Sequence, residues 1–298
     1  MNFTHLHLGG GGFSTFCYIG SLICIEQNMS ILFRNSKIDF ISGTSAGAFF
    51  AYLYSIGYSG KQLMSFILSK SNDKDYFKLT REFDIETLLT EYHCMNSNTF
   101  INLLKELSNK KNIDFDTVSF KYIYDTFNKK LAITASCLTT SLPYIFSNDN
   151  HPDMPVKKAL EITSAIPFIF KPICYENKLF VDGSVSCDFH KDLYKDNVLI
   201  IISRSNYTKY TCIKQIEKYN SCGNLGILTT ILNLVITNLS GYSSCSSLIS
   251  KKWYNKHVIT IYNEYPIITP DDDINRGYLI KMFDSGYCFM KNYIKKNI

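Results

Sequence analysis

The stretch Ile41-Ser-Gly-Thr-Ser-Ala-Gly-Ala-Phe-Phe-Ala51 decides how the chain is expected to fold. Asp39 to Ile41 is typical of the end of a short buried strand, and an apolar helix follows from Ala46. Between them, Gly43 and Gly47 flank Ser45 at the spacing G-x-S-x-G. A strand that turns sharply into a helix strains the serine backbone and brings chain segments so close that only tiny residues fit. The pattern predicts a nucleophile elbow, which exposes the serine hydroxyl at a helix N-terminus that favours an oxyanion.

A glycine run near the start of the chain indicates a second anion-binding element. Phe3 to Leu8 alternates as a strand does, Gly9 to Gly12 follows it, and Phe13 to Gln27 has helical spacing. The free N–H groups of such a loop suit either a nucleotide phosphate or a transition-state oxyanion. Dinucleotide binding fits poorly because Thr15 stands where the last glycine of G-x-G-x-x-G belongs, and no Lys-Ser/Thr pair indicates a P-loop. An oxyanion hole that serves Ser45 fits the order better.

The remaining chain alternates helical and strand patterns, which predicts one α/β domain over residues 1–298. Val198 to Ser203 is an unbroken apolar run, as a central parallel strand would be. The other strands are predicted at 131–137, 144–147, 179–181 and 258–262, and the other helices at 61–70, 99–108, 117–127, 155–165 and 275–296. We also predict a packed helix at 226–239, which is too short to span a bilayer, and a polar excursion at 72–91 that shapes acyl-chain entry.

Charge and cysteine usage narrow the class of protein. The net charge of +5 is spread along 298 residues without a long basic block, which argues against a nucleic-acid partner. The 10 Cys include no CxxC pair, so zinc and redox motifs are unsupported and free thiols in a reducing compartment are expected. No secretory signal pattern is evident at the start. We expect an intracellular, cytoplasmic protein. The basic residues near Lys291 are compatible with weak attraction to anionic membrane, and the alternative is an ordinary solvated basic tail.

A serine needs a positioned base before it is a good nucleophile, and the residues leave two kinds of base open. His257, just before the last predicted strand, fits the order Ser, Asp, His of α/β-hydrolases, and His190 is a weaker candidate. Asp182 ends a short apolar strand and is followed by Gly183, at a position where open α/β sheets place their sites. An Asp-Gly pair is also ordinary turn chemistry.

Four blocks taken together resemble the patatin-like phospholipases. They are Leu6-His-Leu-Gly-Gly-Gly-Gly-Phe-Ser-Thr15 with Tyr18-Ile-Gly-Ser-Leu22, then Gly43-Thr-Ser-Ala-Gly47, Ser164-Ala-Ile-Pro-Phe-Ile-Phe-Lys-Pro172 and Phe180-Val-Asp-Gly-Ser184. Each block is weak alone, but their order is specific. Leu279-Ile-Lys-Met-Phe-Asp-Ser-Gly-Tyr287 also resembles the family's last helix, so the resemblance covers nearly the whole chain.

The resemblance implies a three-layer α/β/α fold with a mainly parallel central sheet and a Ser-Asp dyad without histidine. Ser45 would be the nucleophile and Asp182 the base that activates it and later a water. Gly10, Gly11 and Gly12 would form the oxyanion hole, with the Ala46 amide as an extra donor. The implied substrates are phospholipids and other acyl lipids at a membrane surface, and no metal or organic cofactor is implied.

Two places depart from the family pattern. Ser14 and Thr15 stand where the family carries Arg or Lys followed by Gly, which removes a cation and stiffens the loop. Ser184 stands where the family has Gly or Ala, and 187–190 holds Cys-Asp-Phe-His in place of the usual Asn and Pro positions. Three hypotheses follow: a serine lipid acyl hydrolase of altered rate or selectivity, an inactive lipid-binding protein, and a triad esterase that uses His257. The sequence does not assign a head group, an sn position or an oligomeric state.

Overall fold

The computed structural model describes residues 1–71, 73, 93, 99–186, 197–205, 257–263 and 275–297. The predicted excursion at 72–91, except for residue 73, and the predicted helix at 226–239 lie outside these ranges. His190 and the departure at 187–190 lie outside them as well.

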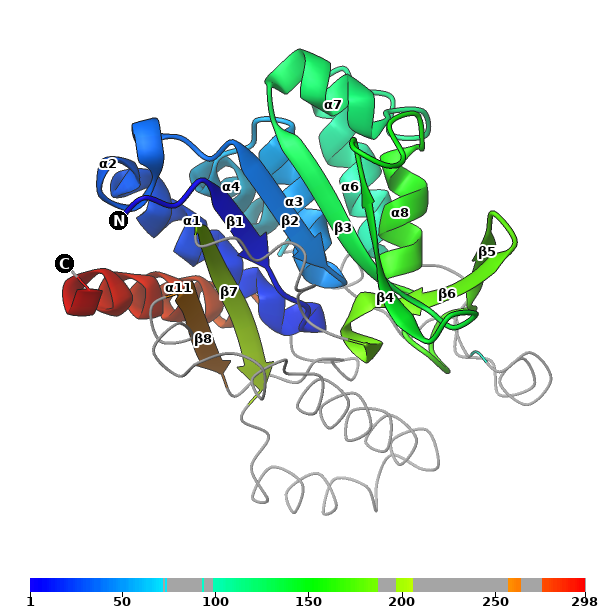
Figure 1. Cartoon of the computed structure of the whole chain (residues 1–298). Coiled ribbons are helices and arrows are strands. Elements are labelled where there is room, and N and C mark those ends of the chain that lie inside the picture. Colours follow the sequence, from blue (N-terminus) through cyan, green and yellow to red (C-terminus); the bar gives the residue numbers. More distant parts are fainter. Residues whose placement is uncertain are drawn as a thin grey trace, which may run out of the picture.

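The described strands form one eight-stranded sheet (Figure 1). They are β1 (His5–Leu8), β2 (Phe40–Thr44), β3 (Lys130–Cys137), β4 (Leu142–Ser147), β5 (Ile173–Tyr175), β6 (Lys178–Asp182), β7 (Val198–Ser205) and β8 (Val258–Asn263). Five of them, in the spatial order β3, β2, β1, β7, β8, pair in parallel. Strand β4 pairs with β3 in the antiparallel sense, as do β6 with β3 and β5 with β6. The sheet is therefore mixed but mostly parallel.

Strands β2 and β6 lie along the same edge of β3. Strand β4 occupies the other edge of β3. Some of the β3 residues that pair with β4 also pair with β2, and the others also pair with β6, so β4 must lie on the opposite edge from both. Thr44, the last residue of β2, pairs with Thr134, while Asp182, the last residue of β6, pairs with Ala135. Since β2 is parallel to β3 and β6 is antiparallel to it, the two strands run toward each other and their last residues meet.

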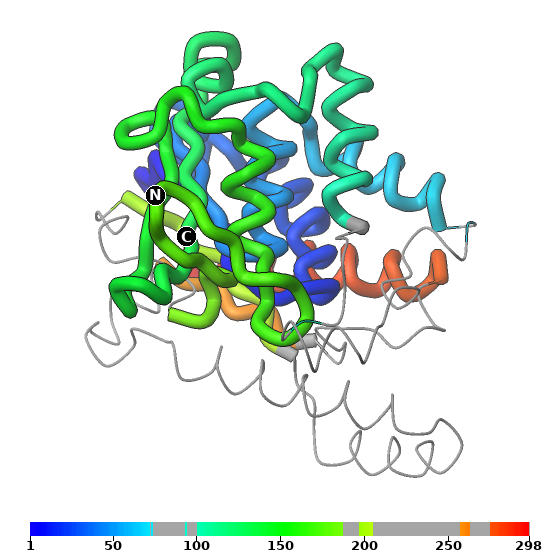
Figure 2. The backbone as a smooth tube through the Cα atoms, turned by 90° about the vertical axis from the view of Figure 1, so that its right-hand side faces the viewer, coloured from blue at the N-terminus to red at the C-terminus, as the bar shows by residue number. Residues whose placement is uncertain are grey.

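Helices flank the sheet, as the predicted three-layer α/β/α class requires. Those described are α1 (Cys17–Gln27), α2 (Met29–Leu32), α3 (Ala46–Ser55), α4 (Gly60–Lys70), α6 (Thr99–Lys110), α7 (Phe120–Phe127), α8 (Val156–Thr163) and α11 (Arg276–Asn297). Seen from the side in Figure 2, α1, α4 and α11 lie together on one side of the strands, and α11 packs along α1. Helix α4 begins with a capping box in which Ser59 and Gln62 bond each other's backbone.

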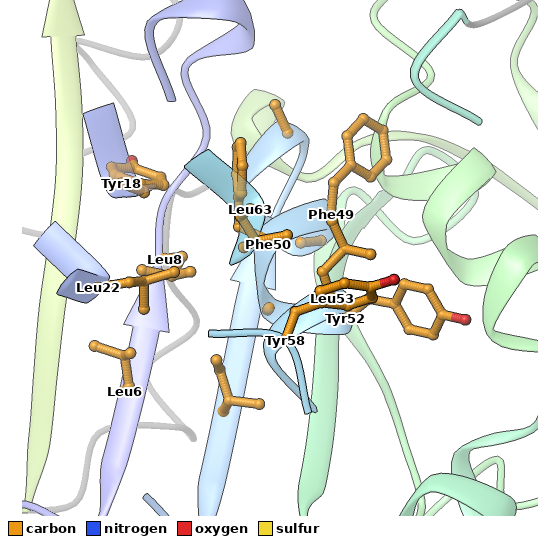
Figure 3. Close-up of a cluster of buried hydrophobic side chains, with 14 of the residues drawn as sticks. Leu6, Leu8, Tyr18, Leu22, Phe49, Phe50, Tyr52, Leu53, Tyr58 and Leu63 are labelled. Atoms are coloured by element: carbon orange, nitrogen blue, oxygen red, sulfur yellow. The ribbon is translucent and has the colours of Figure 1, made fainter. Parts of the chain in front are cut away.

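The core lies between the parallel strands and these helices. Figure 3 shows side chains of β1, α1, α3, α4 and the connection between α3 and α4 gathered in one cluster: Leu6, Leu8, Tyr18, Leu22, Phe49, Phe50, Tyr52, Leu53, Tyr58 and Leu63. All of them are buried. Tyr18 also bonds the backbone at the ends of two strands, because its hydroxyl donates to Gly9 O at 2.9 Å and accepts from Ser203 N at 2.9 Å. The core thus supports the loop that follows β1.

The predicted strands and helices within the described ranges are confirmed to within a few residues, and the fold class is confirmed. Two short elements were not predicted. Strand β5 has only three residues, and α2 has only four, so neither is long enough to show a periodic pattern.

Candidate active site

Ser45 occupies a strained turn between β2 and α3. Its backbone angles are φ 52° and ψ −133°, outside the regions that a serine adopts comfortably. A Cβ atom on Gly43 would lie 2.5 Å from Ala48 Cα, and one on Gly47 would lie 2.2 Å from Gly9 O. Both contacts are with backbone, so neither neighbour can move aside without displacing the helix or the strand. The G-x-S-x-G spacing therefore corresponds to the sharp turn that the sequence predicted.

The meeting of β2 and β6 brings Asp182 to Ser45. The Ser45 hydroxyl donates a hydrogen bond to Asp182 Oδ2 at 2.5 Å, although 137 positions separate the two residues in sequence. Ser45 is 4% exposed and Asp182 is 3% exposed. A carboxylate this close can accept the hydroxyl proton, which is the arrangement that an activated serine nucleophile needs.

The Asp182 carboxylate is held in a fixed orientation. Its Oδ1 accepts from the amide of Ser184 at 2.8 Å, which leaves Oδ2 toward Ser45. Its own amide donates to Ala165 O at 2.9 Å, and the Ser136 hydroxyl donates to its carbonyl oxygen at 2.8 Å. A Cβ on Gly183 would lie 2.3 Å from Thr134 O, so glycine is required for the chain to leave β6 this close to β3.

Thr163, the last residue of α8, fixes the backbone of the nucleophile. Its Oγ1 accepts from the Ser45 amide at 2.8 Å and donates to the carbonyl oxygen of Thr134. The sequence did not indicate this contact. The one available signal was position, because Thr163 directly precedes the Ser164-Ala-Ile-Pro block that resembled the family.

The glycine loop after β1 lies against Ser45. A Cβ on Gly10 would lie 3.2 Å from Ser45 Cβ. The amides of Gly10 and Gly11 donate no hydrogen bond to any residue that the structure describes. Gly12 has φ 53° and begins a 3-10 helix, η1 (Gly12–Phe16). Ala46 begins α3, so the amide of Ala46 is one of the first N–H groups of α3. Of the predicted donors, Gly10 therefore packs directly against Ser45 and Ala46 follows it in the chain, whereas a Cβ on Gly11 would meet Ser14, Thr15 and Ser203 instead.

Ser14 and Thr15, which stand where the family pattern has a cation followed by glycine, form hydrogen bonds with this loop. The Ser14 hydroxyl donates to Gly11 O at 2.6 Å, and the Thr15 hydroxyl donates to Gly12 O at 2.6 Å. Ser203, in β7, donates in turn to Ser14 Oγ at 2.8 Å. Both Ser14 and Thr15 are fully buried. Two hydroxyls thus fasten the loop that the sequence predicted to be stiffened.

His257 lies far from Ser45, at the opposite end of the parallel strands. Its Nδ1 is 2.8 Å from Val198 O at the start of β7, and its ring packs against Phe3 with the ring centroids 5.6 Å apart. Ser45 follows the end of β2, and three strand spacings separate β2 from β8, about 14 Å in all. The hypothesis of a triad with His257 is therefore wrong. The order Ser, Asp, His says nothing about which end of a strand a residue occupies.

Two other buried histidines share one hydroxyl on the sheet. Ser42 Oγ lies 2.6 Å from His5 Nε2 and 2.7 Å from His7 Nδ1. A hydroxyl has one proton to donate, so at least one of the two ring nitrogens must carry a proton and donate to it. These contacts position β1 against β2 behind the glycine loop.

Within the described ranges, no group of three or more His, Cys, Asp or Glu side chains is arranged to hold a metal ion. Nor does any described helix combine the length and apolar character needed to cross a lipid bilayer.

Comparison with known proteins places this arrangement in a family. The sequence model described as Patatin-like phospholipase matches residues 6–190, a range that holds the glycine loop, Ser45 and Asp182. The chain is 26% identical over 271 residues to the uncharacterized protein R571 of Acanthamoeba polyphaga mimivirus, covering 87% of this chain and 83% of that protein. It is 27% identical over 198 residues to the probable lipid hydrolase 463L of Invertebrate iridescent virus 6, covering 63% of this chain and 62% of that protein.

A solved structure has the same fold. VipD from Legionella pneumophila matches with a TM-score of 0.58 at 14% sequence identity, over 100% of this chain and 67% of that one. From the family match over more than half of its length, the chain belongs to the patatin-like phospholipase family.

Proposed function

We propose that this protein is a serine lipid acyl hydrolase that cleaves fatty-acyl esters through an acyl-Ser45 intermediate. The observation that carries the proposal is the 2.5 Å hydrogen bond from Ser45 Oγ to Asp182 Oδ2 at a strained elbow. Membership of the family and the probable lipid hydrolase among its relatives support an acyl lipid as substrate. Phospholipids and lysophospholipids in a membrane surface are the substrates that we propose.

In the acylation step, Asp182 Oδ2 accepts the Ser45 proton while Oγ attacks the ester carbonyl carbon. The negative charge that forms on the carbonyl oxygen is stabilised by the amides of Gly10 and Gly11, which have no acceptor among the described residues. We propose Gly12 and Ala46 as neighbouring donors. The tetrahedral intermediate then collapses, and the leaving alkoxide takes the proton from Asp182.

In the deacylation step, Asp182 accepts a proton from water, and the resulting hydroxide attacks the acyl carbon. The bond to Ser45 Oγ breaks, and Oγ recovers its proton from Asp182. The same carboxylate thus serves both halves of the cycle, and its fixed orientation favours this because Oδ2 need not move between them. We place the enzyme in the cytoplasm, in transient contact with membranes.

The test is fatty-acid release from vesicles of phosphatidylcholine and phosphatidylglycerol, compared with release from lysophosphatidylcholine. Ser45→Ala and Asp182→Asn should each abolish release while circular dichroism and thermal unfolding stay unchanged. His257→Asn is the matched control and should retain release. A Ser45→Ala protein that hydrolyses at the wild-type rate would refute the proposal. Lipid binding without any hydrolysis by the wild type would favour the inactive lipid-binding protein instead.

A further inference from the structure

Ser184, two positions after the base, has a buried hydroxyl that bonds nothing in the described part of the chain. It lies in a short 3-10 helix, η4 (Gly183–Val185), which turns the chain immediately after β6. Its amide donates to Asp182 Oδ1, but its Oγ is buried and has no hydrogen-bond partner among the described residues. A buried hydroxyl without a partner is unfavourable, so such a group calls for a specific explanation.

The hydroxyl packs against the glycine loop next to Ser45. A Cβ atom on Gly10 would lie 2.1 Å from Ser184 Oγ and 3.2 Å from Ser45 Cβ. Ser184 and Ser45 therefore both pack against Gly10. The Asp182 carboxylate links the same two residues, since its Oδ1 accepts from the Ser184 amide and its Oδ2 from the Ser45 hydroxyl. A buried polar atom thus lies beside the base, the nucleophile and Gly10, one of the proposed oxyanion donors.

We propose that Ser184 Oγ binds and orients the water that hydrolyses the acyl-enzyme, an inference that rests on the proposed acyl-Ser45 intermediate. The water donates one proton to the Asp182 carboxylate, and its oxygen forms a bond to the acyl carbon. The bond between that carbon and Ser45 Oγ breaks, Oγ takes the proton from Asp182, and the fatty acid leaves. Ser184 exchanges no proton in net terms; its hydroxyl fixes the position of the water.

Position favours water over the oxyanion as the partner of this hydroxyl. The oxyanion has the amides of Gly10 and Gly11 available to it. The attacking water must instead reach the base, and Ser184 is bonded to that base through its own amide. A water needs two or more polar partners to stay in place, and the Ser184 hydroxyl and the Asp182 carboxylate supply them. Deacylation should therefore depend on Ser184 more than acylation does.

The experiment compares Ser184→Ala with wild type on p-nitrophenyl butyrate. Alanine removes only the oxygen and suits this turn, since the family pattern allows it there. Three quantities are measured: the turnover number, the fraction of acyl-Ser45 found by intact mass after an acid quench, and the rate of labelling by a fluorophosphonate. Labelling reports the nucleophilicity of Ser45 and requires no water.

The turnover number should fall by about fivefold or more, as expected for one hydrogen bond lost from the deacylation transition state. The acyl-Ser45 fraction should rise while labelling stays within about twofold of wild type. Ser186→Ala is the matched control, because its hydroxyl lies in the same turn but bonds Ser136 Oγ at 2.8 Å. It should leave the acyl fraction unchanged.

A fall in turnover without a rise in the acyl fraction would overturn the inference, because the defect would then lie in acylation. Unchanged turnover and acyl fraction would overturn it as well. Absence of both hydrolysis and labelling in the wild type would instead refute the proposed function itself, and the inference with it.

Discussion

Two sets of glycines allow close contacts in this molecule, and they serve different purposes. One set surrounds Ser45, where Gly10, Gly43 and Gly47 let the glycine loop, β2 and α3 meet. The other set lies where α1 crosses α11. There a Cβ on Gly20 would lie 1.8 Å from Phe283 O, and one on Gly286 would lie 1.8 Å from Cys17 O. The contacts at the helix crossing are the tighter ones, at 1.8 Å compared with 2.1 Å for Gly10, 2.5 Å for Gly43 and 2.2 Å for Gly47.

The difference between the two sets is what each contact positions. At the helix crossing, glycine lets two helices approach until backbone touches backbone, and Ser21 Oγ donates to Gly286 O at 3.1 Å. This contact stabilises the fold but lies away from the reacting atoms. Beside Ser45, glycine lets the loop after β1 pack against the side chains of Ser45 and Ser184. We therefore expect the helix glycines to affect the free energy of unfolding and Gly10 to affect turnover.

The largest expected effect is that of Gly10→Ala on activity. The added methyl would meet Ser184 Oγ and Ser45 Cβ, so either the loop or the nucleophile must shift. We expect ester hydrolysis to fall by about 10²–10³-fold, as when one oxyanion donor is lost. The thermal unfolding midpoint should change little, since the atoms that it meets are short side chains. A midpoint that falls steeply would show that both sets of glycines serve stability.

The next effect is that of Gly286→Ala on stability. The added methyl meets backbone of α1, so α11 must move away, and overpacking of this kind destabilises by about 1–3 kcal/mol. Urea unfolding measures the change. Hydrolysis at low temperature should be retained. Gly277→Ala is the matched control in the same helix, because its nearest contact is the Asn275 side chain at 3.3 Å. Its effect should stay within about 1 kcal/mol of zero.

The smallest effect is on thiol reactivity at the same crossing. Cys17 is fully buried, and burial raises the pKa of its thiol to about 12. Only about one thiol in ten thousand is then ionised at pH 8, and the thiolate is the reactive form. Cys288, on the exposed side of α11, should react with iodoacetamide while Cys17 does not. Peptide mass spectrometry follows both sites.

Gly286→Ala should leave Cys17 unreactive, because its Sγ lies toward Ser203 of β7 and only its backbone meets Gly286. Equal rates for Cys17 and Cys288 in the wild type would contradict the burial of Cys17 between α1 and β7.

The candidate site residues were more predictable from the sequence than the residues and contacts that hold them in place. The elbow and the glycine loop are local, since a strand, a glycine turn and a helix follow one another within a few residues. The helix crossing joins Gly20 to a segment more than 260 positions away, and neither glycine belongs to a spacing that announces the contact. Thr163 and Ser136 act through hydrogen bonds that form only after β2, β3 and β6 have assembled.

The failure of the alternative triad hypothesis has a related cause. His257 was considered because of its order in the chain, but in a parallel sheet the end of the strand decides which residues meet. Asp182 was noted at a strand end, where an ordinary Asp-Gly turn was the alternative, and the family resemblance implied its role; its carboxylate does lie within hydrogen-bond distance of Ser45. Position along a strand was therefore the better guide than position along the chain.

The most direct test of the account is the rate at which a fluorophosphonate labels Ser45, with the labelled peptide identified by mass spectrometry. The account predicts labelling at Ser45 in the wild type, none in Ser45→Ala, and labelling slowed by about 10²–10⁴-fold in Asp182→Asn, the range for loss of a general base. Labelling of Asp182→Asn at the wild-type rate would contradict the claim that Asp182 activates Ser45.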